Sequence, residues 1–394
     1  MTRSKTFSAM PLVLALSFSL AMVSGCKKES APGAASNAAP VGDTIKIGEV
    51  GSMTGGEASF GISTSRGVQM ALDEVNGAGG VNGKKLEILA LDDQGKQDEA
   101  ATAVTKLITQ NKVIAILGEV ASSRSLAMAP IAQQYKIPMI TPASTNPAVT
   151  EKGDFIFRVC FIDPFQGTVM AKFALNNLKA KKVAILRDVK SDYSVGLADF
   201  FIKAFTQGGG QVVADLSYST GDTDFASQLT AIRAKSPEAI FVPGYYTEVG
   251  LVARKAKELG IKAPLMGGDG WDSPRLIEIG GEALNGSYFS NHYSSDDTSP
   301  EVQDFVQRYK KAYNETPDSM AVLGYDALHV LVGAMKHAKS LAGPDLRDAI
   351  AQTKDFKTVT GKITIDAKRN PVKSAVVLKI ENKAYKFQTS VNPT

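Results

Sequence analysis

A regular alternation of short apolar runs with segments of helical periodicity, from residue 44 onward, most constrains the fold of this chain. The run 113–117 is continuously apolar and rich in β-branched residues, which is typical of a strand buried on both faces of a parallel sheet. Comparable runs alternate with apolar stripes at helical spacing, and they cover 45–50, 86–91, 183–186 and 239–242. This order predicts an α/β fold in which helices cover both faces of a doubly wound parallel sheet.

The pattern restarts after 155–161, so the sequence predicts two lobes of similar plan. A chain of 394 residues with 44% hydrophobic residues is also too long for one ordinary domain. Beyond residue 296 the order changes, and we expect helices at 300–313, 319–341 and 344–353, then strands near 359–365, 374–380 and 384–389. Nothing in these late segments says on which lobe they pack.

Hydroxyl-rich loops follow two neighbouring strands of the predicted sheet. Ser122 follows the run 113–117 close to the start of a helix, so that free backbone N–H groups and a positive dipole end could face an anion. The next strand leads into a loop that contains Ala143, Ser144 and Thr145. Each loop alone could be only a helix cap or a turn. Because ligands of open α/β sheets bind beyond the carboxyl ends of the strands, the two loops together favour a binding site.

The second lobe carries further candidates in the same kind of position. Tyr193, Tyr245 and Asp269 each follow the carboxyl end of a predicted strand. A loop tyrosine can equally be an ordinary surface residue, and an aspartate among glycines can be a turn former. Trp271, the only tryptophan, lies beside Asp269 and either covers a pocket or packs beneath the loop. The shared position of the three residues is what favours a ligand-binding role.

A basic start and an apolar run at 10–23 mark the N-terminus. The run is too short to span a membrane, and its position predicts a secretory signal over residues 1–25. It ends in Val-Ser-Gly-Cys, which resembles the lipobox of bacterial lipoproteins and implies lipidation of Cys26. Ordinary cleavage that leaves a free thiol is the alternative. Residues 26–43, mostly Ala, Ser, Pro and Gly, predict a flexible tether between a membrane anchor and a periplasmic or extracytoplasmic body.

The sequence contains no recognisable arrangement for catalysis. Its three histidines are scattered, and no pair has a metal-ligand spacing with carboxylate or thiolate support. It shows no nucleophile elbow, P-loop or CxxC motif. With 44 basic and 40 acidic residues, and no clustering of basic with aromatic residues, a nucleic-acid partner is not expected. We therefore expect a protein that is not an enzyme and uses neither a metal nor another cofactor.

Four motifs, taken in order, resemble the periplasmic leucine/isoleucine/valine-binding proteins of ABC transporters. They are Asp-Glu-Val-Asn and Gly-Gly-Val-Asn-Gly within 73–83, Asp-Asp at 92–93, Ile-Thr-Pro-Ala-Ser-Thr at 140–145, and Gly-Gly-Asp-Gly at 267–270. The resemblance extends from residue 44 to residue 390. It implies the type I periplasmic-binding-protein fold, with two doubly wound parallel-sheet lobes joined by a three-strand hinge. It assigns 44–161 and 292–362 to lobe 1, and 162–291 and 363–394 to lobe 2.

The resemblance also implies a role for each candidate residue in binding an amino acid. Ser122 and the backbone N–H of Thr145 are expected to bind the α-carboxylate, with Tyr245 reaching it from the second lobe. The Ala143 carbonyl, the Thr145 hydroxyl and the Asp269 carboxylate are expected to bind the α-ammonium group. Phe60 and Tyr193 are expected to line the side-chain pocket. Ser144 and Trp271 are also expected among the ligand-binding residues. A buried zwitterion needs such donors and acceptors, because unpaired buried charges cost several kcal/mol.

From these observations we expect a monomeric extracytoplasmic solute-binding protein. It would capture aliphatic branched-chain amino acids between its lobes and deliver them to an ABC permease. Two departures bear on the ligand, since Phe60 stands where relatives often carry tyrosine and Asp269 where some carry glutamate. The alternatives are the same fold binding another amino acid or a small amide, and a sensory ligand-binding protein.

Overall fold

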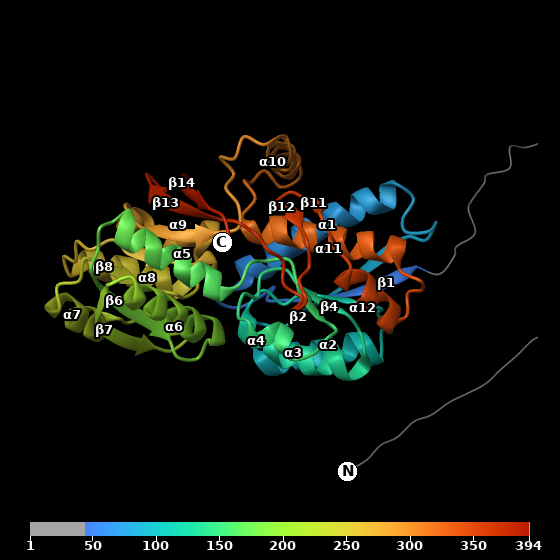
Figure 1. The fold of residues 1–394 in the computed structure, drawn as a ribbon, viewed down its shortest axis with the longest axis horizontal. Helices are drawn as coiled ribbons and strands as arrows, with labels where there is room; N and C mark the ends of the chain where they lie inside the picture. The colour runs from blue at the N-terminus through green and yellow to red at the C-terminus, as the bar shows by residue number, and fades with distance from the viewer. Residues whose placement is uncertain (1–43, 394) are drawn as a thin grey trace, which may run out of the picture. The chain divides into compact units, whose positions relative to one another are not determined.

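The computed structural model describes residues 44–393 (Figure 1). The predicted signal peptide, Cys26 and the tether lie outside the described residues. In the described part of the chain, no helix is both long and apolar enough to cross a membrane.

The first lobe is built on a five-stranded parallel sheet in the order β2-β1-β3-β4-β5. Its strands are β1 (Ile45–Gly51), β2 (Leu86–Asp92), β3 (Ile116–Leu117), β4 (Met139–Thr141) and β5 (Ile156–Arg158). Helices α2 (Gln97–Thr109) and α3 (Ser122–Tyr135) pack on one face, and the short helix α4 (Ala148–Glu151) follows β4. Helices α1 (Ala58–Gly77) and α11 (Ser319–His337) pack on the other face, side by side although they are far apart in the sequence (Figure 1).

The second lobe is built on a seven-stranded sheet in the order β14-β13-β10-β9-β8-β6-β7. Its strands are β6 (Lys182–Asp188), β7 (Gln211–Tyr218), β8 (Ala239–Phe241), β9 (Leu265–Gly267), β10 (Tyr288–Asn291), β13 (Ala375–Glu381) and β14 (Ala384–Val391). All neighbours are parallel except β13, which runs antiparallel to both β10 and β14. Helices α5 (Asp163–Asn176) and α6 (Asp192–Gln207) pack on one face. The other elements are α7 (Ala226–Ala234), α8 (Tyr246–Glu258), η1 (Asp269–Trp271), α9 (Pro274–Gly280) and η2 (Gly281–Leu284).

The chain passes between the two sheets three times, namely between β5 and β6, after β10, and before β13. After the second crossing, α10 (Pro300–Tyr313), α11 and α12 (Gly343–Ala351) join the first lobe, where Arg308 on α10 pairs with Glu74 on α1. The hairpin β11 (Phe356–Thr358) and β12 (Gly361–Ile363) follows, and β13 and β14 return to the second sheet. The late helices therefore pack on the first lobe. The exact residues at which the lobes divide stay a prediction.

Two local differences from the sequence-based expectations have physical reasons. Strand β10 was not predicted, because its sequence Tyr-Phe-Ser-Asn lacks a continuous apolar run. The strand expected at 359–365 is instead a hairpin that reverses near Gly361, whose φ of +107° favours glycine. Ser122, expected close to the start of a helix, is itself the first residue of α3, and Ala121 occupies the N-cap position.

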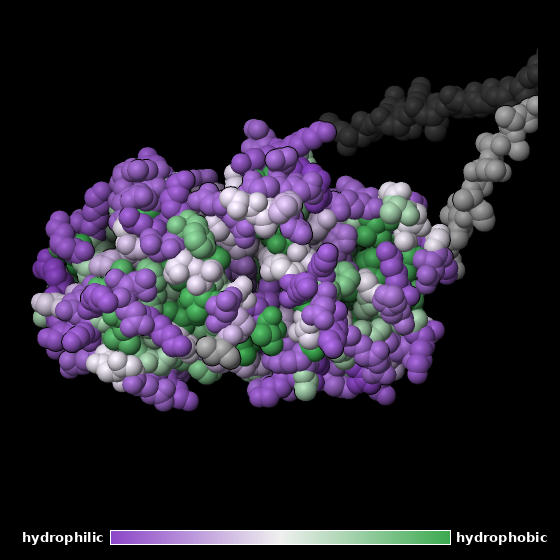
Figure 2. Space-filling view, turned by 45° about the horizontal axis from the view of Figure 1, so that its top comes forward, coloured by the Kyte–Doolittle hydropathy of each residue, from purple (hydrophilic) through white to green (hydrophobic). Residues whose placement is uncertain are grey.

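The face of the protein in Figure 2 is mostly hydrophilic, with hydrophobic residues in small separate patches. Within residues 44–393, the large apolar side chains that stay exposed are scattered, and they are Ile62, Tyr135, Val189, Val372 and Phe387. Scattered exposed apolar residues are normal on a protein surface and need no partner to cover them. The expected monomeric state stays a prediction.

Candidate functional site

A small cavity, with a volume of about 10 Å³, lies between the lobes, at the carboxyl ends of the strands of both sheets. Its lining residues come from both lobes and are Phe60, Val120, Ser122, Ala143, Tyr193, Tyr245, Asp269, Gly270 and Met320. Most of the residues predicted from the sequence are therefore brought together in one place. A larger surface groove, lined among others by Tyr293 and Tyr385, contains none of them.

Ser122 forms the first-lobe end of the cavity. It is the first residue of α3, so the helix N-terminus points its free N–H groups and positive dipole end here. Ser122 does not cap the helix; its Oγ accepts a hydrogen bond from the backbone N–H of Asn146 at 3.2 Å. This bond joins the two loops that the sequence analysis singled out. The arrangement favours binding of an anionic group at this end of the cavity.

The loop after β4 contributes Ala143 to the cavity wall, whereas Ser144 and Thr145 lie behind it. Ser144 Oγ donates within the loop core, at 2.9 Å from the Val120 carbonyl oxygen and 2.7 Å from Ser125 Oγ. The Thr145 side chain is fully buried. Burial raises the pKa of the nearby Asp163 carboxyl to about 7, and the Thr145 hydroxyl has a smaller, opposite effect on this pKa. Ser144 is thus committed to internal hydrogen bonds.

A buried arginine that the sequence analysis did not identify supports this loop. The Arg158 guanidinium is fully buried and donates to the carbonyl oxygens of Ser144 and Asn146, the latter at 2.9 Å. Burial lowers the pKa of this guanidinium. By binding two carbonyls of one loop, Arg158 fixes the course of the backbone between Ala143 and Asn146.

Asp269 forms the second-lobe end of the cavity and is almost completely buried. The Tyr193 hydroxyl donates to its Oδ1 at 2.9 Å, and Nε2 of His292 lies 2.9 Å from its Oδ2. Burial lowers the pKa of His292, so the imidazole is neutral near pH 7. Within residues 44–393, His292 is the only basic side chain within ion-pair distance of Asp269. The carboxylate thus has hydrogen-bond donors but no cation to balance its charge.

Aromatic rings form the wall between these two ends. The rings of Tyr193 and Tyr245 are stacked, with centroids 5.2 Å apart and planes at 4°. Phe60 meets Tyr245 edge-on, with centroids 5.4 Å apart and planes at 83°. Val120 and Met320 complete an apolar surface beside Phe60. Burial raises the pKa of Tyr245 well above its usual value, so its hydroxyl remains a donor.

Trp271 is not among the residues that line the cavity. Its side chain is fully buried, and Nε1 donates to the Val242 carbonyl oxygen at 2.9 Å. Its ring packs at a centroid distance of 6.0 Å from Phe289 in the second-lobe core. The structure therefore places Trp271 beneath the loop that carries Asp269. It does not cover the pocket, which was the other arrangement that the sequence allowed.

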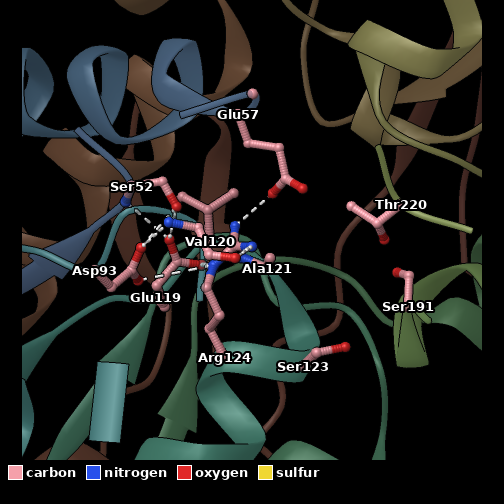
Figure 3. Close-up of polar contacts among 12 residues, drawn as sticks. Ser52, Glu57, Asp93, Glu119, Val120, Ala121, Ser123, Arg124, Ser191 and Thr220 are labelled. Carbon is pink, nitrogen blue, oxygen red and sulfur yellow. Dashed lines mark hydrogen bonds and ion pairs between the residues drawn. The ribbon is translucent and has the colours of Figure 1, made fainter. Parts of the chain in front are cut away.

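A second charged group lies behind the first-lobe wall of the cavity, and we call it the Arg124 cluster (Figure 3). It consists of Arg124, Glu57, Asp93 and Glu119, all almost completely buried. Arg124 Nη2 lies 2.6 Å from Glu57 Oε2, and Nε lies 3.2 Å from Glu119 Oε2. Burial, reinforced by the charge of Glu119, raises the pKa of Asp93 to about 7, while Arg124 lowers it. The guanidinium stands among its carboxylates, and none of the four residues lines the cavity.

The two lobes are in direct contact on both sides of the cavity. On one side, the backbone N–H of Ser59 donates to the Tyr246 hydroxyl at 3.1 Å, and Thr247 Oγ1 donates to the Gly56 carbonyl at 2.7 Å. On the other, the backbone N–H of Asp192 donates to Ser123 Oγ at 2.9 Å. The structure is therefore that of a closed cleft.

Several residues of the site were missed from the sequence. Val120 and Gly270 are direct neighbours of predicted segments, so the same rule about carboxyl ends would have found them. His292 immediately follows β10 and could have been found only if that strand had been recognised. Met320, on α11, gave no local signal, because its position depends on the packing of a late helix. In the described range, no group of three or more histidine, cysteine, aspartate or glutamate side chains could hold a metal ion.

Comparison with known proteins gives a consistent set of relatives. The model of a family described as periplasmic binding protein matches residues 44–384. The Leu/Ile/Val-binding protein homolog 3 of Brucella melitensis is 30% identical over 323 residues, which are 81% of this chain and 86% of that relative. A crystal structure of a leucine-binding protein, LivK, from Thermotoga maritima has a TM-score of 0.86 at 44% identity, covering 89% of this chain and 99% of that one. The branched-chain amino acid substrate-binding protein LivJ of Streptococcus pneumoniae, solved with isoleucine, has a TM-score of 0.85 at 36% identity, covering 89% and 100%.

Proposed function

The chain belongs to the periplasmic binding protein family, and on this premise we propose that it captures leucine, isoleucine or valine and delivers it to an ABC permease. The family is one of solute-binding proteins, in agreement with the expectation that the chain is not an enzyme. The proposal takes its ligand class from the relatives, and the geometry of the cavity supports it independently.

The observation that carries the proposal is the uncompensated carboxylate of Asp269 opposite the N-terminus of α3. A free amino acid presents an ammonium group and a carboxylate a fixed short distance apart. Asp269 offers acceptors and negative charge to the ammonium group, whereas Ser122 and the helix N-terminus offer donors to the carboxylate. Ala143 and Tyr245 border the same space from the two lobes and complete the shell around this head group.

The apolar wall supports an aliphatic side chain. Phe60, Val120 and Met320 present no charged group to the cavity, and buried apolar contact contributes about 25 cal/mol per Å² removed from water. The predicted roles of Thr145 at this head group and of Tyr193 in the side-chain pocket form part of the same proposal.

A thermal-shift screen over all amino acids, with small amides and aromatic acids included, tests the ligand class. A ligand present at a hundredfold excess over its Kd stabilises the folded state by about 2.7 kcal/mol, and we expect the largest shifts with leucine, isoleucine and valine. Stabilisation by another class alone would replace this ligand assignment, and the family would then account only for the fold.

We also propose that the body is held at a membrane by a lipid on Cys26. The lipobox-like sequence before this residue supports the assignment. We expect the wild-type protein in the membrane fraction of cells that express the full chain, and Cys26→Ser in an unlipidated form. Cys160→Ala is the matched control, since Cys160 is buried in the body and its loss should leave the membrane association unchanged. Wild-type protein recovered free of lipid would contradict the anchor.

A further inference from the structure

We propose that His292 is a positioning residue for recognition of the ligand's amino group: it holds the Asp269 carboxylate toward the cavity while leaving its negative charge for the ligand. This inference rests on the proposed function, because it assumes that the ligand carries an ammonium group. It adds a residue that lies outside the cavity wall and does not touch the ligand.

The hydrogen bonds within the protein leave lone pairs of the Asp269 carboxylate free to accept from a ligand. Its two oxygens receive one donor each, from the Tyr193 hydroxyl and from His292 Nε2, both at 2.9 Å. A carboxylate accepts hydrogen bonds but does not donate them, so the proton of the imidazole lies on Nε2. Since two carboxylate oxygens offer about four lone-pair sites, the two donors fix the orientation of the group and leave sites for an ammonium group.

The charge state of the imidazole matters as much as its position. The ring is completely buried, and burial lowers its pKa, with Lys373 acting in the same direction against the opposing effect of Asp269. A neutral donor orients the carboxylate without cancelling its charge. A lysine or arginine in this place would form a full ion pair with Asp269 and compete with the ammonium group of the ligand.

His292 is itself fixed by the connections between the lobes. It lies just after β10, in the second crossing of the chain, and its ring stacks on Phe161 of the first crossing with centroids 3.8 Å apart and planes at 26°. The backbone N–H of Asp269 donates to Gln166 Oε1 at 2.8 Å, and this oxygen also accepts from Ser290 Oγ at 2.8 Å. Both the backbone and the side chain of Asp269 are therefore held by residues next to the hinge.

The test compares two substitutions of His292 with two ligands that differ only in the amino group. His292→Gln keeps an N–H donor near the position of Nε2, whereas His292→Leu keeps bulk and removes the donor. The ligands are leucine and its deaminated analogue, 4-methylpentanoate, and the affinities are measured by calorimetry and by competition. His337→Leu, at an exposed histidine, is the matched control, and circular dichroism confirms that each variant folds.

A hydrogen bond to a charged group is typically worth about 1.5–3 kcal/mol. We therefore expect His292→Leu to lose about tenfold or more in leucine affinity. His292→Gln should stay within about threefold of wild type, and the affinity for 4-methylpentanoate should change by less than about threefold in both variants. In an Asp269→Asn background, His292→Leu should cause no comparable further loss, because the charge that it orients is gone.

Two results would overturn the proposal while the proposed function stands: an equal loss of affinity for both ligands in His292→Leu, or a loss in His292→Gln as large as in His292→Leu. If His292→Leu does not fold, His292→Asn takes its place, since its shorter amide cannot reach Asp269. A wild-type protein that binds no amino acid would instead overturn the proposed function, and this inference with it.

Discussion

Two buried groups of charged side chains lie near the cavity in opposite lobes, and they differ in whether a cation accompanies the carboxylates. The Arg124 cluster of the first lobe places one guanidinium among three carboxylates, with Glu57 and Glu119 at 2.6 Å and 3.2 Å. Asp269 of the second lobe has only uncharged donors, Tyr193 and a neutral His292. The carboxylates of the first group share a cation, whereas within residues 44–393 Asp269 has none and leaves a negative charge facing the cavity.

The difference shows that burial of charge does not by itself mark a binding site. The carboxylates of the Arg124 cluster have a cation beside them and protein donors such as the Ser52 hydroxyl, which donates to Asp93 at 2.8 Å, so they do not depend on a ligand for a cationic partner. A buried charge with oriented donors and no counter-ion is stabilised when a ligand of opposite charge binds. Substitutions that remove one charge from each group should therefore have different consequences.

Arg124→Met should have the largest effect, and the effect should be on stability. The substitution keeps much of the side-chain volume but leaves three buried carboxylates without their cation, and breaking a buried ion pair in this way costs about 3–5 kcal/mol. We expect the free energy of unfolding to fall by that amount in urea titrations. Among the molecules that remain folded, leucine affinity should change by less than about tenfold.

Arg275→Met is the matched control for this comparison, because Arg275 is exposed and pairs with Glu278 on the same helix turn. Exposed pairs contribute under about 1 kcal/mol, so the control should unfold almost as the wild type does. An Arg124 variant as stable as the Arg275 variant would show that the guanidinium does not hold the cluster together.

Asp269→Asn should have the next largest effect, and the effect should be on binding. The amide keeps the shape of the side chain and removes its charge, so the ligand's ammonium group loses its partner in a closed cleft. Loss of one member of such a pair costs about 2–5 kcal/mol, or roughly a 30- to 5,000-fold loss of affinity by calorimetry. Asp304→Asn, at an exposed position, is the control. Binding within about threefold of wild type would remove Asp269 from the ammonium site.

Glu49→Gln should have the smallest effect, a pH-dependent change in stability. It tests a carboxyl that is buried but has no expected role in ligand binding. Glu49 is buried in the first lobe and does not line the cavity, and its carboxyl accepts a hydrogen bond from Ser65 Oγ at 3.3 Å. Burial raises its pKa from 4.5 to about 7, so the folded state favours the protonated form. The stability that this group contributes is complete below pH 4.5 and is lost as the pH rises through 7.

The glutamine variant should therefore be more stable than the wild type at pH 8, by up to about 3 kcal/mol, and nearly equal to it at pH 4.5. Urea titrations at the two pH values measure this difference. Leucine affinity should change by less than about threefold, because Glu49 does not line the cavity. A pH-independent difference in stability would mean that the carboxyl does not titrate in this range.

Local patterns in the sequence were sufficient to predict the alternating elements and most of the residues in the cavity. Ser122, Ala143 and Asp269 were identified because each follows a recognisable strand, and parallel strands direct their carboxyl ends to one edge. Strand β10 could not be predicted from the sequence, because its four residues mix aromatic and polar side chains. With that strand unrecognised, His292 was one of three scattered histidines rather than a residue at the same edge.

The sequence by itself determined the two-lobe α/β plan and the position of the binding loops, because periodicity and turn chemistry depend on near neighbours in the chain. Only the tertiary structure decided which buried carboxylates lie beside a cation. The partners that decide it are far apart in the sequence: Arg124 and Glu57 are 67 positions apart, and Asp269 and His292 are 23 apart. Packing also keeps Trp271 and Ser144 out of the cavity wall, because the indole N–H and the hydroxyl donate to backbone carbonyl oxygens in the core. A buried polar group must be satisfied by whatever the fold brings near it, and no local pattern records that choice.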